Sequence, residues 1–266
     1  MATRDILMYD AGGEPHNCAA AGPPIRTRFR PSANGPLHFG GAYVARQNWW
    51  CARSKGGEFI LIVDDVCPTF KYGESLELTK SVRAWGDQFQ RDLEWLGYAP
   101  DLTVYASEFA DAHRDAAARL NITSCGYPDL PSLQRYVHSI SEGTEDTYHP
   151  WLTLGRVTDD HTLGVTDFLR GGDLIGEILL YDHLARTLYG EGCRINQQYT
   201  EVIVEPATDH VCSKSDGTPG IADYREAGVT PEQINEALGK LLDVPGAYGK
   251  AAINYRQIDG DLLQVP

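Results

Sequence analysis

The sequence predicts a doubly wound α/β fold built on a parallel sheet, and three observations support this prediction. Strand-like and helix-like segments alternate along the chain. A continuous apolar run at 58–65 ends in two carboxylates, as expected of a central parallel strand. The segment 28–42 passes through Pro and Gly from an extended stretch into a helix. Ligands of such folds bind at the carboxyl ends of the strands, where the strand order reverses.

The elements can be assigned in order along the chain. We expect strands at residues 25–29, 58–65, 102–105, 162–169 and 195–204. We expect helices at residues 40–55, 75–96, 108–120 and 175–188, with two or three more closing the chain. The stretch 121–154, with its Pro, Ser and Gly content, reads as irregular, and 212–217 reads as a polar loop.

The length of 266 residues is enough to bury a sizeable core. We expect a Gly-, Ala- and Pro-rich extension at 1–24, a main α/β domain at 25–205 with an insertion at 121–154, and a loop followed by helices at 206–266. The apolar run 59–63 is too short to cross a bilayer, and the start lacks the order of a signal peptide. The sequence therefore predicts a soluble cytoplasmic protein.

Charge and cysteine content narrow the function classes. The chain has 23 Lys and Arg against 37 Asp and Glu, a net charge of −14. This acidity counts against non-specific binding to nucleic acid, although a local basic patch can survive in an acidic protein. The six cysteines form no C-x-x-C pair, so we expect free thiols and neither a disulfide framework, a zinc ribbon nor another metal site.

Two segments far apart in the sequence are candidates for binding a triphosphate. His38, Gly40 and Gly41 stand at a predicted helix N-terminus, where backbone N–H groups attract anions and glycines let a phosphate approach closely. Lys214 lies in a polar loop beside Ser213. Alone, the first is usually an ordinary turn and the second a solvated lysine. Together they offer donors to both ends of a triphosphate.

Charged residues of the predicted strands are candidates for binding an amino acid. Asp64 and its neighbour Asp65 end a buried strand, where they either serve as caps or arginine partners or bind a substrate ammonium. Arg28 and Arg170 lie on strands, and buried arginines need anionic partners. That partner could be the 159–160 Asp-Asp pair or a substrate carboxylate held by two hydrogen bonds.

These segments resemble class I aminoacyl-tRNA synthetases of the glutamyl/glutaminyl type, including short glutamyl-queuosine tRNA synthetase-like proteins. Residues 27–41 resemble the first strand and HIGH motif of that family, and 56–65 resemble its second strand. Residues 157–171 are similar to the second half of its nucleotide fold, and 211–215 fit its KMSKS loop. The ordered resemblance covers roughly residues 25–240.

The resemblance implies a Rossmann-like catalytic domain that uses ATP, with Mg²⁺, to turn an amino acid into an aminoacyl-adenylate and pyrophosphate. It implies that ATP is bound by His38, Gly40, Gly41, Ser213 and Lys214. Of these, His38, Ser213 and Lys214 would be catalytic. It assigns a glutamate-like substrate to Arg28, Ser32, Asp64, Tyr148 and Arg170, with Asp64 binding the α-ammonium.

The chain also departs from the family. Val211 replaces the first lysine of the KMSKS loop, and Ile62 replaces the arginine that usually precedes the acidic pair. The insertion that grips the tRNA acceptor stem is reduced to about 121–154, and only some 25 to 50 residues follow the loop, where the family has an anticodon-binding region. The zinc-binding cysteines of the short relatives are missing.

Three functions are compatible with these residues. The sequence favours transfer of the activated amino acid to an acceptor other than tRNA, such as a small amine, a thiol or a carrier protein. The alternative is a minimal synthetase that charges tRNA or modifies a tRNA nucleoside. A second alternative is an inactive paralogue that binds an amino acid or nucleotide, for which Val211 is the best support.

Overall fold

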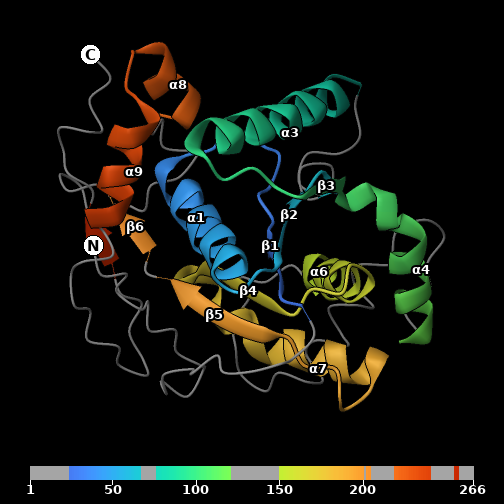
Figure 1. Cartoon of the computed structure of the whole chain (residues 1–266). Coiled ribbons are helices and arrows are strands. Elements are labelled where there is room, and N and C mark those ends of the chain that lie inside the picture. The colour runs from blue at the N-terminus through green and yellow to red at the C-terminus, as the bar shows by residue number, and fades with distance from the viewer. Residues whose placement is uncertain are drawn as a thin grey trace.

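A five-stranded parallel sheet carries the fold, with strand order β3-β2-β1-β4-β5 (Figure 1). The computed structural model describes residues 24–66, 76–120, 150–200, 202–204, 219–240 and 255–257. The strands of this sheet are β1 (Arg26–Phe29), β2 (Glu58–Val63), β3 (Leu102–Tyr105), β4 (Asp167–Gly171) and β5 (Asn196–Thr200). The strand order reverses between β1 and β4, which confirms the doubly wound α/β fold.

Helices cover both faces of the sheet, and β2 shows why. Its residues Phe59, Leu61 and Val63 point into one core, whereas Ile60 and Ile62 point into the other. The first core is shared with α1 (Phe39–Ser54) and α3 (Leu76–Leu96), and the second with α4 (Ala110–Arg119), α6 (Pro150–Thr162) and α7 (Ile178–Tyr189). Figure 1 shows α1 and α6 on opposite sides of the strands.

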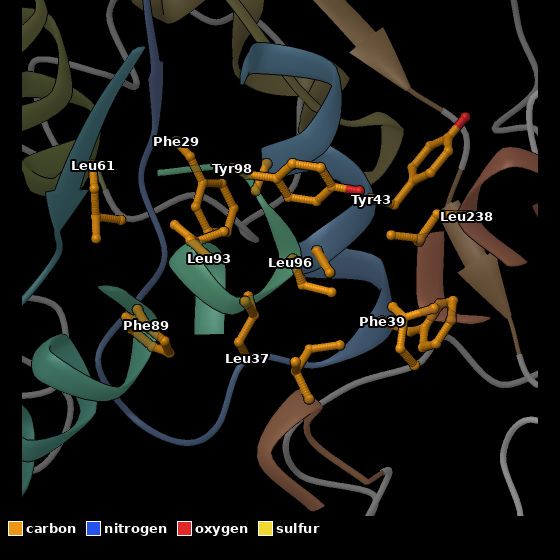
Figure 2. Close-up of a cluster of buried hydrophobic side chains, with 14 of the residues drawn as sticks. Phe29, Leu37, Phe39, Tyr43, Leu61, Phe89, Leu93, Leu96, Tyr98 and Leu238 are labelled. Atoms are coloured by element: carbon orange, nitrogen blue, oxygen red, sulfur yellow. The ribbon is translucent and has the colours of Figure 1, made fainter. Parts of the chain in front are cut away.

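The first core extends from the sheet to the helices that follow the predicted polar loop at 212–217. Figure 2 shows Phe29 of β1 and Leu61 of β2 beside Phe89 and Leu93 of α3, with Leu238 at the far side. Leu238 belongs to α9 (Pro231–Lys240), which follows α8 (Ile221–Glu226). The short strands β6 (Val202–Val204) and β7 (Tyr255–Gln257) form a separate parallel pair.

Most predicted elements are confirmed, and two predictions are wrong. Residues 150–162 form helix α6, where we expected an irregular segment up to 154 and a strand from 162, and β4 begins only at Asp167. The buried face of α6 carries carboxylates instead of an unbroken apolar stripe, so its helical period is concealed in the sequence. The predicted strand 195–204 is divided between β5 and β6, which belong to different sheets.

Several predicted segments lie outside the described residues. These are residues 1–23 of the extension, 121–149 of the insertion and the polar loop at 212–217. The domain boundaries therefore stay predictions. Over the part of the chain that the structure describes, no helix has the length and apolar character needed to cross a membrane.

Asn48 of α1 forms hydrogen bonds with both strands at the switch point between β1 and β4. The ladder between these strands has one registered pair, Thr27 with Asp167. Asn48 of α1 accepts a hydrogen bond from the N–H of Leu169 at 2.9 Å and donates to its carbonyl at 2.8 Å. The Thr27 hydroxyl in turn donates to the carbonyl of Asn48 at 2.8 Å. Asn48 thus supplies partners for buried backbone groups of β4, next to Arg170.

Helix α8 packs against the turn that leads into α1. The N–H of Ile221 donates to the carbonyl of Leu37 at 2.7 Å, and Gly220 forms an antiparallel bridge with His38. A Cβ on Gly220 would lie 2.6 Å from Cβ of Pro36, far inside van der Waals contact. A glycine at position 220 is therefore what allows this close approach.

We predict that Gly220→Ala lowers the free energy of unfolding by about 1–3 kcal/mol, because the added methyl group overlaps the rigid Pro36 ring. Urea denaturation measures this change. Gly239→Ala is the matched control, since a Cβ there would lie 3.7 Å from Nη1 of Arg46, an ordinary contact, within helix α9. Equal destabilisation by both substitutions would contradict the role given to the Gly220–Pro36 contact.

Candidate active site

Arg28 of β1 points toward helices α6 and α7, where it meets a carboxylate. Its Nε and Nη2 donate to the two carboxylate oxygens of Asp160 at 2.9 and 3.0 Å, and both side chains are buried. The Tyr181 hydroxyl donates to the same carboxylate at 2.7 Å. Burial, together with the charge of Asp160, raises the pKa of Tyr181, so the hydroxyl keeps its proton. Asp160 is thus the anionic partner that a buried Arg28 requires.

Arg30 is a charged residue of this region that the sequence analysis did not single out. Its Nη1 donates to Asp159 at 2.7 Å, and its Nε donates to Asp64 at 3.2 Å. Burial alone would lower the pKa of Arg30, but the surrounding carboxylates outweigh burial and raise it overall. The sequence signal that could have identified Arg30 is its position two residues after Arg28, which places both side chains on the same face of an extended segment.

Asp64 is held in place by the chain that follows β1. Its N–H donates to the carbonyl of Pro31 at 2.9 Å, and its carbonyl accepts from Ala33 at 3.0 Å. Ser32 lies between these partners in a parallel bridge with Asp64, and its hydroxyl oxygen is buried. The Asp64 side chain is itself buried, at 2% exposure. The structure therefore brings two of the predicted amino-acid-binding residues together.

Asp65 has a different environment from Asp64. Its carboxylate accepts hydrogen bonds from the N–H and the hydroxyl of Ser107, at 2.9 and 2.5 Å. Ser107 lies in the 3-10 turn at Ala106–Phe109 that follows β3. Burial raises the pKa of Asp65, and the two hydrogen bonds from Ser107 oppose that rise. Asp65 thus serves as a cap, one of the two functions considered for the pair.

Arg170 of β4 is buried and bound on several sides. Its Nη1 donates to Glu177 at 2.9 Å, and its Nη2 donates to Tyr199 at 2.8 Å and Gln197 at 3.3 Å. Glu177 also accepts a hydrogen bond from Nη1 of Arg156 at 2.6 Å. The Nε of Arg170 is buried and has no hydrogen-bond partner within the described residues.

The two predicted substrate-binding arginines lie over the same aromatic ring. The Arg28 guanidinium carbon is 3.9 Å from the centroid of Phe168, and that of Arg170 is 5.3 Å from it. A ring face attracts cations, so Phe168 stabilises two guanidinium groups beside the switch point. The structure therefore places both of these arginines against the same side chain at the switch point.

His38 is the N-cap of α1, where the sequence predicts the helix to begin. Its Nδ1 accepts a hydrogen bond from the N–H of Gly41 at 3.4 Å, and the first turn of the helix contains no acidic side chain. A Cβ on Gly40 would lie 3.2 Å from the His38 ring, and one on Gly41 would lie 2.9 Å from Leu37. The glycines thus leave room for the His38 ring and the Leu37 side chain, and the helix end keeps its attraction for anions.

The remaining predicted site residues, Ser213, Lys214 and Tyr148, lie outside the described residues. Among the side chains that are described, no group of three or more His, Cys, Asp and Glu is arranged to hold a metal ion. Within the described residues, neither Cys51 nor Cys193 takes part in a disulfide.

Comparison with known proteins connects this site to one family. Residues 24–135 match the family model described as tRNA synthetases class I (E and Q), catalytic domain. A glutamate--tRNA ligase 2 of Neorickettsia sennetsu is 27% identical over 243 residues, which cover 82% of this chain and 55% of the relative. The chain thus spans about half the length of this ligase.

A shorter relative and a solved structure are similar over most of the chain. The glutamyl-Q tRNA(Asp) synthetase of Deinococcus radiodurans is 26% identical over 280 residues, covering 84% of this chain and 90% of the relative. The crystal structure of a glutamate-tRNA synthetase from Elizabethkingia anophelis shares the fold with a TM-score of 0.60, at 17% identity over 82% of this chain and 62% of that one.

The ordered motifs, the parallel sheet with its switch point and these similarities agree with one another. The similarities support a catalytic core of the class I tRNA synthetase type, in the group that includes the glutamyl and glutaminyl enzymes.

Proposed function

We propose that this protein activates glutamate with ATP and transfers the glutamyl group to tRNA. The observation that carries the proposal is the pair Arg28 and Arg170 over one ring at the switch point, with Asp64 and the start of α1 on neighbouring elements. These groups can bind a carboxylate, an ammonium and a phosphate respectively, the three charges of glutamate and ATP that the reaction must bring together.

The proposed acceptor differs from the one that the sequence favours. The reduced insertion and the acidic charge favour a small molecule or carrier protein. The relatives favour tRNA, because all those cited here carry tRNA in their names. The chain covers 90% of the glutamyl-Q tRNA(Asp) synthetase, so short length alone is no argument against a tRNA acceptor.

Activation requires the glutamate α-carboxylate to attack the α-phosphorus of ATP. A bond forms between the attacking oxygen and that phosphorus, and the bond to pyrophosphate breaks. We assign the phosphate contacts to His38 and the first turn of α1, with Gly40 and Gly41 beside them. Lys214 and Ser213 would bind the leaving phosphates. Mg²⁺ would enter bound to ATP and neutralise part of its charge.

The glutamate side chain is assigned to Arg28 and Arg170. A guanidinium has five N–H donors, and Asp160 accepts hydrogen bonds from two nitrogens of Arg28. The pair with Asp160 therefore leaves further N–H donors of Arg28 for a ligand. The buried Nε of Arg170 also supports a ligand role, because an unmade hydrogen bond of this kind is costly until a ligand or water supplies the acceptor. Ser32 and Tyr148 complete the proposed amino-acid site, and the amino group is assigned to Asp64.

Arg170→Ala is expected to raise the KM for glutamate by roughly tenfold or more while the KM for ATP stays unchanged, because a charge-assisted contact is lost. ATP–pyrophosphate exchange measures both constants. Arg156→Ala is the matched control, since it removes the other arginine bound to Glu177. An unchanged KM for glutamate in the first variant would contradict the assignment.

Lys214→Ala is expected to slow adenylate formation by about 10²–10³-fold with little change in the KM for glutamate, because its charge acts on the departing pyrophosphate. Rapid-quench measurement of adenylate gives the rate. Lys55→Ala, which changes a lysine at the end of α1, serves as the control. Equal loss of glutamate binding and rate in Lys214→Ala would exclude this role.

The acceptor is tested with labelled glutamate, ATP and total tRNA. We expect label to become acid-precipitable and RNase-sensitive, and a rise in salt to reduce the transfer because phosphate contacts are screened. Adenylate formation with label passing only to an added amine, thiol or carrier protein would support the first sequence-based interpretation instead. Absence of pyrophosphate exchange with glutamate, both with and without tRNA, would overturn the proposed activity and favour the inactive paralogue.

A further inference from the structure

Arg30 occupies a buried position between two carboxylates that come from different elements. Its side chain is 3% exposed, that of Asp64 2%, and that of Asp159 0%. Nε faces Asp64 at 3.2 Å, and Nη1 faces Asp159 at 2.7 Å. Because the guanidinium is planar and rigid, engaging it on two sides fixes its orientation. Arg30 therefore links the end of β2 to helix α6 through the chain that follows β1.

The carboxylate on the far side of Arg30 is itself held by a third element. Nε2 of His113, on α4, lies 2.5 Å from Oδ1 of Asp159, while Oδ2 of Asp159 receives Arg30. A Cβ on Gly155, one turn earlier on α6, would lie 3.5 Å from the His113 ring and 3.9 Å from Nη2 of Arg30. Four buried side chains thus form a line, Asp64–Arg30–Asp159–His113, and Gly155 lies beside its outer end.

The inner end of this line is Asp64, the residue assigned to the substrate ammonium. The backbone of Asp64 is fixed by hydrogen bonds to Pro31 and Ala33, which leaves the side-chain torsions as its main freedom. Arg30 contacts Oδ2 and so restricts the rotation of the carboxylate. A carboxylate has two oxygens and about four acceptor positions, so one carboxylate can accept from a guanidinium and an ammonium together.

We propose that Arg30 is a positioning residue that holds the Asp64 carboxylate for the α-ammonium of the amino acid. This inference rests on the proposed glutamate activation and deepens it. Without Arg30, two buried carboxylates would lose the cation they share. Asp64 would then turn away or take up a proton, and either change removes its attraction for an ammonium.

The test compares glutamate with glutarate, which has the same two carboxylates and no amino group. Arg30→Met is expected to raise the KM for glutamate by about tenfold or more. The inhibition constant of glutarate and the KM for ATP are expected to stay within roughly twofold, since neither compound offers an ammonium to Asp64. The KM for glutamate of Arg30→Lys is expected to lie between those of the wild type and Arg30→Met, because a single ammonium reaches one carboxylate and not both.

Matched controls separate positioning from folding. Arg53→Met removes a surface arginine that pairs with Asp101 at 2.8 Å, and it is expected to change none of these constants. Asp159→Asn keeps the shape of the outer anchor and removes its negative charge. It is expected to reproduce the glutamate-specific loss in a milder form, so the proposal remains testable if Arg30→Met does not fold.

Equal weakening of glutamate and glutarate in the Arg30 and Asp159 variants would overturn the inference and leave Arg30 a structural residue. Unchanged glutamate binding would overturn it as well. Failure of the wild-type protein to exchange pyrophosphate with glutamate concerns the proposed function instead. In that case the same comparison is made by calorimetric binding of glutamate and glutarate, where a parallel loss of both still refutes the role of Arg30.

Discussion

The neighbouring carboxylates of Asp159 and Asp160 on α6 neutralise two arginines, Arg30 and Arg28, that β1 and its continuation place on one face of the sheet. Burying these charges separately would be very costly, whereas paired and hydrogen-bonded they are tolerated. The pairing fixes how α6 lies against β1. Asp64, at the carboxyl edge of the sheet, contacts Arg30 directly and is therefore positioned with respect to this pair.

The ion pairs lie where the fold places a ligand. The strand order reverses between β1 and β4, and these strands share one registered pair, with Asn48 of α1 supplying hydrogen bonds to Leu169. The charged residues come from strands and helices, and their side chains are held by neighbours before any substrate arrives. Such preorganisation favours binding of charged reactants, because little reorganisation is needed when they enter. The proposed phosphate contact at the start of α1 and the proposed ammonium contact after β2 lie on neighbouring elements.

The fold class and most elements could be predicted from the sequence because β2 is apolar on both faces and α1 begins at a recognisable cap. For Arg28 the sequence left two kinds of partner open, the 159–160 Asp-Asp pair or a substrate carboxylate, and the structure shows a pair with Asp160. Helix α6 could not be recognised, since its buried face carries the carboxylates that Arg28 and Arg30 require. The different environments of Asp64 and Asp65 depend on contacts with distant segments, which a single sequence does not encode locally. The assignments of Lys214, Ser213 and Tyr148 stay predictions.

The central claim is that one edge of the sheet binds both halves of a glutamyl-adenylate. A crystal structure with a non-hydrolysable glutamyl-adenylate analogue tests this claim most directly. The account predicts the phosphate at the start of α1 beside His38, the ammonium on Asp64, and the side-chain carboxylate between Arg28 and Arg170. An analogue that binds with its ammonium away from Asp64, or its side chain away from both arginines, would contradict it.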